Sequence, residues 1–329
     1  MPHLVAPGAC ARLVHHMPVV VNLTRHSEPS TVTERVLVIV NAASRRGEDA
    51  RGALVTALVA HDFHPVVEPL DDAATLAARV RAHAADVTRV IVAGGDGTVG
   101  TVAGAVLGTG LPLGIVPTGT ANNLARTLGI PASVEEACAL VRAGRTHAID
   151  AAEVNGRVFM TTASIGLSVA ITEALTDDAK RRMGTLAYAA TAARTVRRAE
   201  RFVADITWPG GTRRARTVQV VVGNGRFYGS AMQVADDTRI DDHALDLYSL
   251  EVRAKWRLLA LGPRMKRGTH GDADDVRALR APEFHVATAT PMTVNADGEL
   301  VTETPATFRV LPSALTVYAP DAADAPGLG

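Results

Sequence analysis

Residues 90–98 read VIVAGGDGT, a strand followed by a loop from which the rest of the fold can be predicted. The apolar residues 90–93 are typical of a strand buried on both faces, and a glycine-rich loop follows directly. Outward from it, further strands are predicted at 36–40, 64–70 and 113–116, and helices at 48–60, 73–84 and 121–128. This alternation predicts a parallel, doubly wound α/β sheet whose functional loops lie at the carboxyl ends of the strands.

After about residue 150 the pattern changes to antiparallel β. Asn155-Gly156 predicts a hairpin, and Pro209-Gly210-Gly211 predicts a second one joining 202–208 to 218–222. More strands are expected within 282–295 and 299–320, and a long helix at about 178–200. We therefore expect a loose leader at 1–34, an α/β domain at 35–150 and a mainly antiparallel β domain at 151–329, with a cleft between the two domains.

Composition excludes several classes of protein. The chain has 329 residues, 47% hydrophobic and 21% charged, which excludes disorder and suggests two domains at about 150 residues each. Lys+Arg and Asp+Glu are both 34 and aromatics only 4%, which argues against a nucleic-acid partner. Two cysteines exclude a disulfide scaffold. No membrane span or signal peptide is recognisable, so we expect a cytoplasmic protein that touches membranes transiently.

The glycine loop predicts phosphate binding. Gly94, Gly95 and Gly97 let backbone N–H groups turn toward a phosphate, and Thr98 adds a hydroxyl at a helix start. Asp96 would repel phosphate unless a cation lies between them, so it predicts Mg²⁺ and a nucleoside triphosphate. A second such loop, residues 117–123, follows the next strand.

Two other readings of these loops remain open. Residues 95–100 match G-x-G-x-x-G, but the stretch 115–120 lacks the acid that would hold the ribose of a nicotinamide dinucleotide. Two ordinary strand-to-helix turns would also fit. A Walker loop is excluded because the sequence has no Gly-Lys dipeptide.

Taken together, residues 94–98 and 117–126 resemble the diacylglycerol kinase catalytic domain, and most closely its bacterial soluble lipid kinase branch. The resemblance covers about residues 35–320. Further matching positions are Asn41, Ser44, Ile149-Asp150, Asn224 to Gly229, and the segment Asn295-Ala296-Asp297-Gly298-Glu299, which resembles the Asp-Gly-Glu motif of the family.

This resemblance implies an ATP-dependent lipid kinase that uses Mg²⁺, with ATP in the interdomain cleft. It makes Glu299 the general base, lets Asp96 act through the metal, and places Asp150 near it. Contacts to ATP fall on Asn41, Gly94, Gly95, Asp96, Gly97, Thr98, Val99, Gly100, Thr120 and Asn122. A structural metal would be held by Asp242 and by the main chain of Arg239 and Ala244.

The sequence departs from the family pattern at three places. Ala42 replaces a proline, Asn123 an aspartate, and His243 a glycine at the structural metal. Two alternatives therefore stay open: a kinase of a soluble substrate, similar to NAD kinase, and a catalytically silent module that binds nucleotide or lipid. The sequence does not identify the lipid, and it leaves a homodimer open.

Two basic stretches suit a lipid partner at a membrane surface. Residues 251–270 hold six Lys/Arg and one Glu, and a second group comprises Lys180, Arg181, Arg182, Arg194, Arg197 and Arg198. Each stretch is either a solvated helix face or a surface that docks on anionic lipid.

Overall fold

The computed structural model describes residues 34–41, 45–174, 194–228, 232–234, 238–253, 257–258, 264, 267, 269–270 and 273–329. The predicted leader lies outside the described residues except for Glu34. The same holds for Ser44, for Lys180, Arg181 and Arg182, and for most of the predicted helix at 178–200, of which 194–198 are described and helical. The described residues belong to one compact unit. Among them, no helix is both long and apolar enough to cross a membrane.

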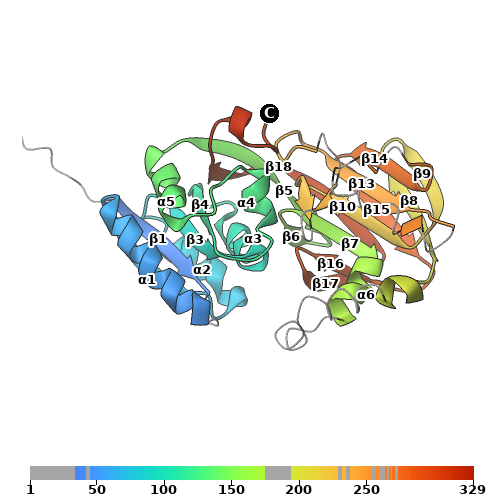
Figure 1. Ribbon diagram of the computed structural model, residues 1–329, viewed down its shortest axis with the longest axis horizontal. Helices are drawn as coiled ribbons and strands as arrows, with labels where there is room; N and C mark the ends of the chain where they lie inside the picture. The colour runs from blue at the N-terminus through green and yellow to red at the C-terminus, as the bar shows by residue number, and fades with distance from the viewer. Residues whose placement is uncertain are drawn as a thin grey trace, which may run out of the picture. The chain divides into compact units, whose positions relative to one another are not determined.

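The first half is the predicted doubly wound α/β arrangement (Figure 1). Strands β1 (Glu34–Val40), β2 (Phe63–Pro69), β3 (Val90–Gly94) and β4 (Leu113–Pro117) pair in parallel in the order β2-β1-β3-β4. The apolar runs of β1, β3 and β4 are buried on both faces, as the sequence predicts, whereas only Phe63 of β2 is buried. The helices are α1 (Arg45–Ala60), α2 (Ala73–His83), α3 (Asp96–Val106), α4 (Asn123–Thr127) and α5 (Val134–Ala143). Contacts join α1 to α5 and α2 to α3.

The second half is mainly antiparallel. One sheet of this half has the order β14-β13-β10-β7-β16-β17. Strands β18, β15, β8 and β9 continue the parallel sheet beyond β4, in that order. The inner faces of the two share an apolar core that includes Ile165, Val222 and Phe308. The bounds are β5 (Thr146–Val154), β6 (Arg157–Phe159), β7 (Thr162–Gly166), α6 (Leu167–Ala174), β8 (Phe202–Trp208), β9 (Gly211–Thr217), β10 (Gln219–Gly223), β11 (Phe227–Tyr228), β12 (Met232–Gln233), β13 (Leu245–Leu250), β14 (Val276–Ala281), β15 (Glu283–Thr288), β16 (Thr293–Ala296), β17 (Glu299–Glu303), β18 (Ala306–Tyr318) and a 3₁₀ turn at Ala322–Asp324.

Two long strands, β5 and β18, run through both halves. Strand β18 pairs in parallel with β4 at Val317, antiparallel with β15 at residues 306–309, and antiparallel with β5 at 308–311 and 315–318. Its pairing with β5 shifts register between Leu311 and Leu315. The domain boundary predicted at residue 150 falls inside β5, and the division into two domains there stays a prediction.

The two predicted hairpins have different outcomes. Asn155-Gly156 joins β5 to β6, and both residues have the positive φ values, 48° and 77°, that this turn requires. The second prediction was wrong in its partner strand: β8 pairs with β9, whereas residues 219–223 form β10 in the other sheet. Strand β9 reads GTRRART and lacks an apolar alternation, so its sequence does not resemble a strand.

Candidate active site

A cavity of about 320 Å³ lies where the carboxyl ends of the parallel strands meet the β16–β17 hairpin. Asn41 follows β1, Leu70 follows β2, residues 95–98 follow β3, and Glu299 begins β17. Thr101 on α3 completes the lining. The structure therefore brings together six of the residues that the sequence selects: Asn41, Gly95, Asp96, Gly97, Thr98 and Glu299.

The two glycine loops touch each other through their backbones. A Cβ placed on Gly95 would lie 3.2 Å from the Cα of Gly119, and one placed on Gly119 would lie 2.5 Å from the Cα of Gly95. Thr118 N also donates to Gly94 O at 3.0 Å. Asn122 has a backbone φ of 48°. Its side chain closes the second loop, because it accepts a hydrogen bond from Gly119 N and donates one to Gly119 O. Gly119 therefore has no room for a side chain, and Gly95 has room only if the facing backbone shifts.

The N-terminus of α3 opens into the cavity. The helix begins at Asp96 with Gly95 as its N-cap, so its first N–H groups have no intrahelical partner and can bind an anion. Asn41 Nδ2 lies 3.5 Å from Thr98 Oγ1 across this opening. Val99 is buried and can contribute only its backbone, and Gly94 and Thr120 do not line the cavity.

Asp96 is held against the start of α4. Its carboxylate accepts hydrogen bonds from Leu124 N at 3.2 Å and from Asn123 Nδ2 at 3.4 Å. Burial raises the pKa of Asp96, the backbone hydrogen bonds partly oppose this, and the nearby charge of Asp297 raises the pKa further. An ionised carboxylate here would be stabilised by an added cation.

The surroundings of Asp96 fit a divalent cation that a ligand helps to hold. Asn123 is buried, and its Oδ1 has no hydrogen-bond partner. A carboxylate and an amide oxygen are ligands that Mg²⁺ accepts. In the described part of the chain, no three His, Cys, Asp or Glu side chains cluster as a metal site. Mg²⁺ usually binds through one or two carboxylates together with substrate phosphates.

Asp297 anchors the hairpin that carries Glu299. At φ 49°, its carboxylate accepts from Met160 N at 2.6 Å, Thr161 N at 3.0 Å and Thr162 N at 3.1 Å, and also from Thr161 Oγ1. The hairpin also lies against α3, because a Cβ on Gly97 would lie 3.7 Å from Glu299 Oε1 and one on Gly100 would lie 3.3 Å from Asp297 Oδ2. The sequence motif contains Asp297, but its four donors lie far away in sequence.

Asp150 does not line the cavity. It is 1% exposed, and its carboxylate accepts from His243 N at 2.6 Å and Ser313 N at 2.7 Å. His243 Nδ1 lies 2.9 Å from the same carboxylate. These contacts tie the loop at 240–244 to β18. A catalytic role for Asp150 stays a prediction.

The predicted structural metal site already contains a cation of the protein itself. Asp242 Oδ1 accepts from Ala244 N at 3.1 Å, and Asp242 Oδ2 pairs with the Arg280 guanidinium. Arg239 pairs with Asp241 at 3.1 Å. His243 has φ 60°, the backbone conformation that the glycine of the family pattern would supply easily. The guanidinium of Arg280 already neutralises Asp242, which does not fit a metal ligand unless Arg280 moves.

Comparison with known proteins agrees with this architecture. Residues 35–154 match the model of the diacylglycerol kinase catalytic domain. Residues 161–319 match that of the YegS C-terminal NAD kinase beta sandwich-like domain.

Individual relatives extend over most of the chain. A YegS-like lipid kinase of Pseudomonas aeruginosa PAO1 is 32% identical over 87% of this chain and 95% of its own length. A diacylglycerol kinase of Mycobacterium tuberculosis H37Rv is 30% identical over 82% of this chain and 86% of its own length. An uncharacterised protein of Synechocystis, 30% identical, is matched over 70% of this chain but 54% of its own length. The crystal structure of a diacylglycerol kinase-like protein from Bacillus anthracis Sterne superposes with a TM-score of 0.73 and 26% identity, covering 88% of this chain and 98% of that one.

Proposed function

Because this chain belongs to the family of YegS-like lipid kinases and diacylglycerol kinases, we propose that it transfers the γ-phosphoryl group of ATP to a hydroxyl of a diacylglycerol-like lipid. One observation supports this most directly: the Glu299 carboxylate and the free N-terminus of α3 line the same cavity. A phosphate-binding helix end and a base therefore border the same space, where transfer would occur.

The residues divide the chemistry between them. The N–H groups of α3 and the Thr98 hydroxyl bind the phosphates of ATP. Glu299 takes the proton of the lipid hydroxyl as its oxygen bonds to the γ-phosphorus and the bond to the β-phosphate oxygen breaks, which releases ADP. A divalent cation, when bound, neutralises phosphate charge, and Asp96 and Asn123 would hold it.

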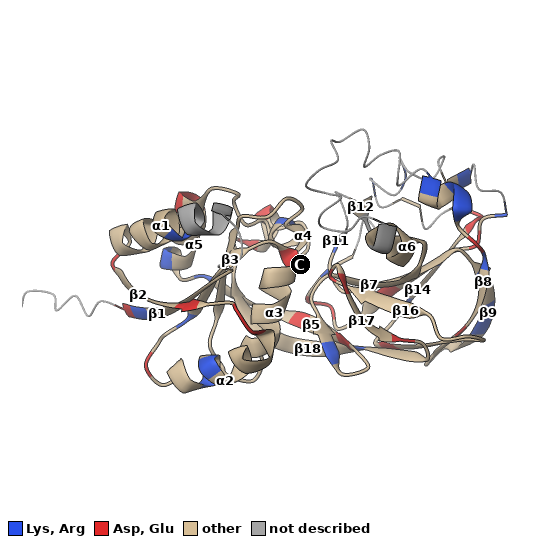
Figure 2. Cartoon of the chain, turned by 90° about the horizontal axis from the view of Figure 1, so that it is seen from below, with Lys and Arg blue, Asp and Glu red and all other residues tan. Residues whose placement is uncertain are grey.

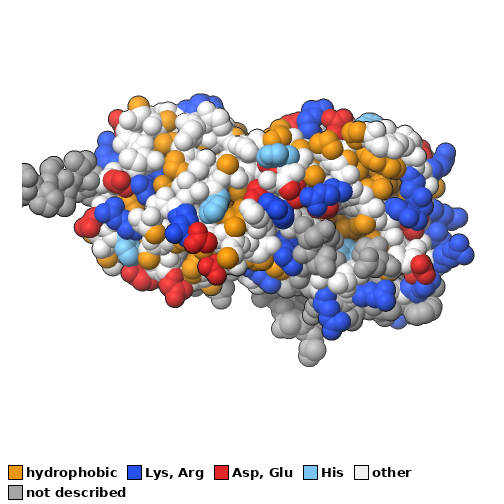
Figure 3. All heavy atoms as spheres, turned by 90° about the horizontal axis from the view of Figure 1, so that it is seen from above, with side chains coloured by type: hydrophobic (Ala, Val, Ile, Leu, Met, Phe, Trp, Pro, Cys, Tyr) orange, Lys and Arg blue, Asp and Glu red, His pale blue; other side chains and the backbone are white. Residues whose placement is uncertain are grey.

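Basic residues support a substrate at a membrane surface. Arg253, Arg264 and Arg267 are exposed, as are Arg194 and Arg198. Figure 2 shows Lys and Arg on the helical residues before β8 and along β9, and Figure 3 shows basic side chains crowded over the antiparallel half. Lys255 and Lys266 of the same stretch lie outside the described residues. Anionic headgroups would attract this surface at about 1 kcal/mol for each basic residue near the membrane.

The variant E299Q tests the proposal, because glutamine keeps the size of the side chain but cannot take the proton. Turnover of Mg²⁺·ATP with diacylglycerol in mixed micelles should fall ~10²–10⁴-fold, while ATP affinity stays unchanged. Glu299 is exposed, so the melting temperature should also stay the same. Wild-type turnover in E299Q would remove Glu299 from the mechanism.

Two further assays separate the alternatives. Phosphorylation of NAD instead of lipid by the wild-type protein would favour a kinase of soluble substrates. Binding of ATP without turnover of any acceptor in a panel of glycerolipid, sphingoid and other lipid alcohols would favour a silent binding module.

A further inference from the structure

One arginine contacts two carboxylates beside the loop at 240–244. Arg280 on β14 lies directly opposite Asp246 on β13, and its Nη1 lies 3.7 Å from Asp246 Oδ1. Its Nη2 donates to Asp242 Oδ2. The side chains of Asp242 and Asp246 are only 13% and 14% exposed, so both charges are largely removed from water. We call these three residues the Arg280 clamp, because one positive charge offsets the repulsion between two carboxylates.

The clamp fixes a loop on which several parts of the chain meet. Next to Asp242, His243 N donates to Asp150 Oδ2 at 2.6 Å. Asp150 N donates in turn to Ile240 O at 2.7 Å, and Ile240 N donates to Gly327 O at 2.9 Å. The loop therefore joins β5 to the C-terminal segment and, through the clamp, to β14.

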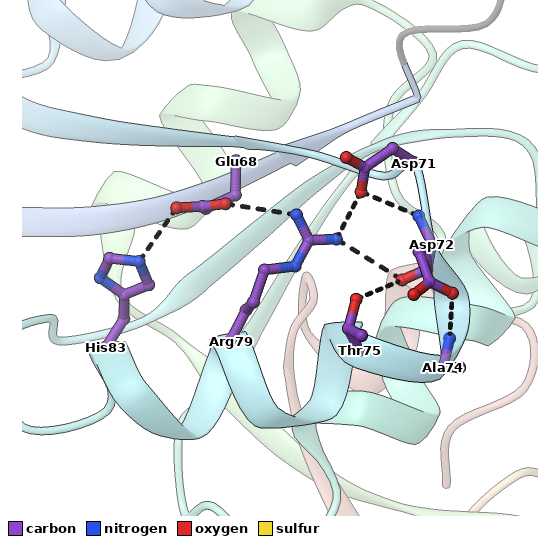
Figure 4. A network of polar contacts seen from close by, with 7 residues as sticks. All are labelled: Glu68, Asp71, Asp72, Ala74, Thr75, Arg79 and His83. Carbon is purple, nitrogen blue, oxygen red and sulfur yellow. Dashed lines mark hydrogen bonds and ion pairs between the residues drawn. The ribbon is translucent and has the colours of Figure 1, made fainter.

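A similar arrangement at the turn after β2 provides a comparison (Figure 4). Arg79 on α2 donates to Glu68 Oε2 at 3.4 Å and to Asp71 Oδ1 at 2.8 Å. The side chains of these two carboxylates are 27% and 62% exposed, so water also stabilises their charges. The carboxylates of the Arg280 clamp are less exposed and depend more on their cation, because an unpaired charge away from water is costly.

The clamp lies where the family resemblance implies a structural metal. That metal would be held by the carboxylate of Asp242 and by the main chain of Arg239 and Ala244. In this structure one oxygen of Asp242 pairs with Arg280, and the other accepts from Ala244 N at 3.1 Å. A metal bound to Asp242 would share the carboxylate with a guanidinium, and two cations so close together repel each other. The residues present therefore do not fit a metal while Arg280 keeps its position.

We infer that Arg280 takes the place of the structural metal, so that a cation of the protein itself holds the loop at 240–244 and no divalent ion is needed there. The inference goes beyond the proposed function, because neither Arg280 nor Asp242 lines the cavity. A cation that Asp96 helps to hold belongs to the nucleotide instead. In the absence of nucleotide, the stability of the protein should therefore not depend on divalent ions.

The test measures the melting temperature without nucleotide, first in a chelator and then in millimolar Mg²⁺ or Ca²⁺. Wild-type protein should melt at the same temperature in all three conditions. R280Q removes the positive charge and should melt about 4 °C or more below wild type in the chelator, because two little-exposed carboxylates lose their cation. Either ion should restore most of this loss, since Asp242, no longer paired, and the carbonyl groups of the loop are ligands that these ions accept.

Three further variants separate loss of charge from metal binding. R277Q is the matched control, because Arg277 is an exposed arginine on the same strand and makes no ion pair within the described part of the chain. It should melt like wild type in every condition. The double variant R280Q/D242N also lacks the carboxylate and should gain nothing from either ion. R280K keeps the charge, should stay insensitive to ions, and covers the case in which R280Q folds poorly.

Elemental analysis of the dialysed proteins gives an independent readout, and wild-type protein should hold no stoichiometric divalent ion. One equivalent of metal that persists in D96N would show that Arg280 moves aside for an ion, and would overturn the inference. A wild-type melting temperature that falls in the chelator and recovers with Mg²⁺ would overturn it as well. So would R280Q if it melts like wild type in the chelator, or if neither ion restores its loss. None of these results decides the proposed function, which the turnover of E299Q tests separately.

Discussion

The carboxylate of Asp297 accepts hydrogen bonds from both the backbone nitrogen and the hydroxyl of Thr161. Asn224 binds the other side of the same segment, because its Nδ2 donates to Met160 O at 2.9 Å and its backbone N donates to Thr161 O at 2.8 Å. Residues 160–162 are thus held on both sides. The hairpin that carries the proposed base is fixed to a segment whose position is itself fixed.

We predict that D297N lowers turnover and stability together. Asparagine tolerates φ 49°, but the amide nitrogen that replaces one carboxylate oxygen cannot accept a hydrogen bond, so one or more of the N–H donors loses its partner. Urea unfolding should show a loss of about 1–3 kcal/mol, and kcat should fall more than the affinity for ATP. The control D62N changes an exposed aspartate with φ 61° outside the site and should be silent in both assays. Unchanged kcat in D297N would show that the hairpin needs no anchor.

A second prediction concerns the pH dependence that Asp96 introduces. Its raised pKa means that the folded state binds a proton more tightly than the unfolded state does. The contribution of this group to stability is therefore largest below pH 3.8, the ordinary pKa of an aspartate, and it is lost as pH rises through the raised pKa. D96N should melt higher than wild type at neutral pH without ligand, and should lose the stabilisation that Mg²⁺·ATP gives. A full ligand-induced shift in D96N would exclude Asp96 from metal and nucleotide binding.

The glycines of the two loops should differ in what they tolerate. G97A adds a Cβ at an ordinary 3.7 Å from Glu299, so the fold should persist while the added methyl group obstructs nucleotide binding. G119A forces a backbone contact at 2.5 Å and should lower the melting temperature as well. G52A, in an open position on α1, should raise stability by up to about 1 kcal/mol without affecting ATP. Equal behaviour of G97A and G119A in melting and binding would contradict this difference.

Membrane attachment should depend on basic residues of one half only. The double variant R264E/R267E should reduce co-sedimentation with vesicles containing phosphatidylserine, and high salt should reduce wild-type binding in the same way. R35E/R51E makes the same change of charge on the exposed surface of the α/β half and should sediment like wild type. Equal losses in both double variants would mean that net charge, rather than this surface, controls attachment.

The α/β half could be predicted from sequence because its signals are local. The apolar run at 36–40 and the loop at 94–98 specify a buried strand and a phosphate loop without knowledge of distant residues. Strand β9 was not predicted because its three arginines occupy an edge strand, where pairing rather than side-chain pattern determines the structure. Helix α6 follows Gly166, whose φ of 98° turns the chain out of β7, and it was also missed.

The site was predictable where a residue acts through its own loop. The glycine loop and Glu299 came from motifs, and the structure brings them to one cavity. Leu70 belongs to no motif, because its place in the cavity lining depends on β2 lying beside β1. The anchors of Asp297 and the partners of Asp150 are tertiary contacts made across more than 90 residues of sequence, which no local pattern encodes.

The place of β18 has a consequence for synthesis on the ribosome. The edge of β4 pairs with a strand that begins at Ala306, near the end of the chain, while the four parallel strands β1 to β4 are complete by Pro117. A nascent α/β half therefore exposes an unpaired, apolar strand edge until almost the whole protein has been translated. Premature termination upstream of Ala306 leaves that edge open, so such fragments should be substrates for chaperones and proteases rather than independent nucleotide-binding domains.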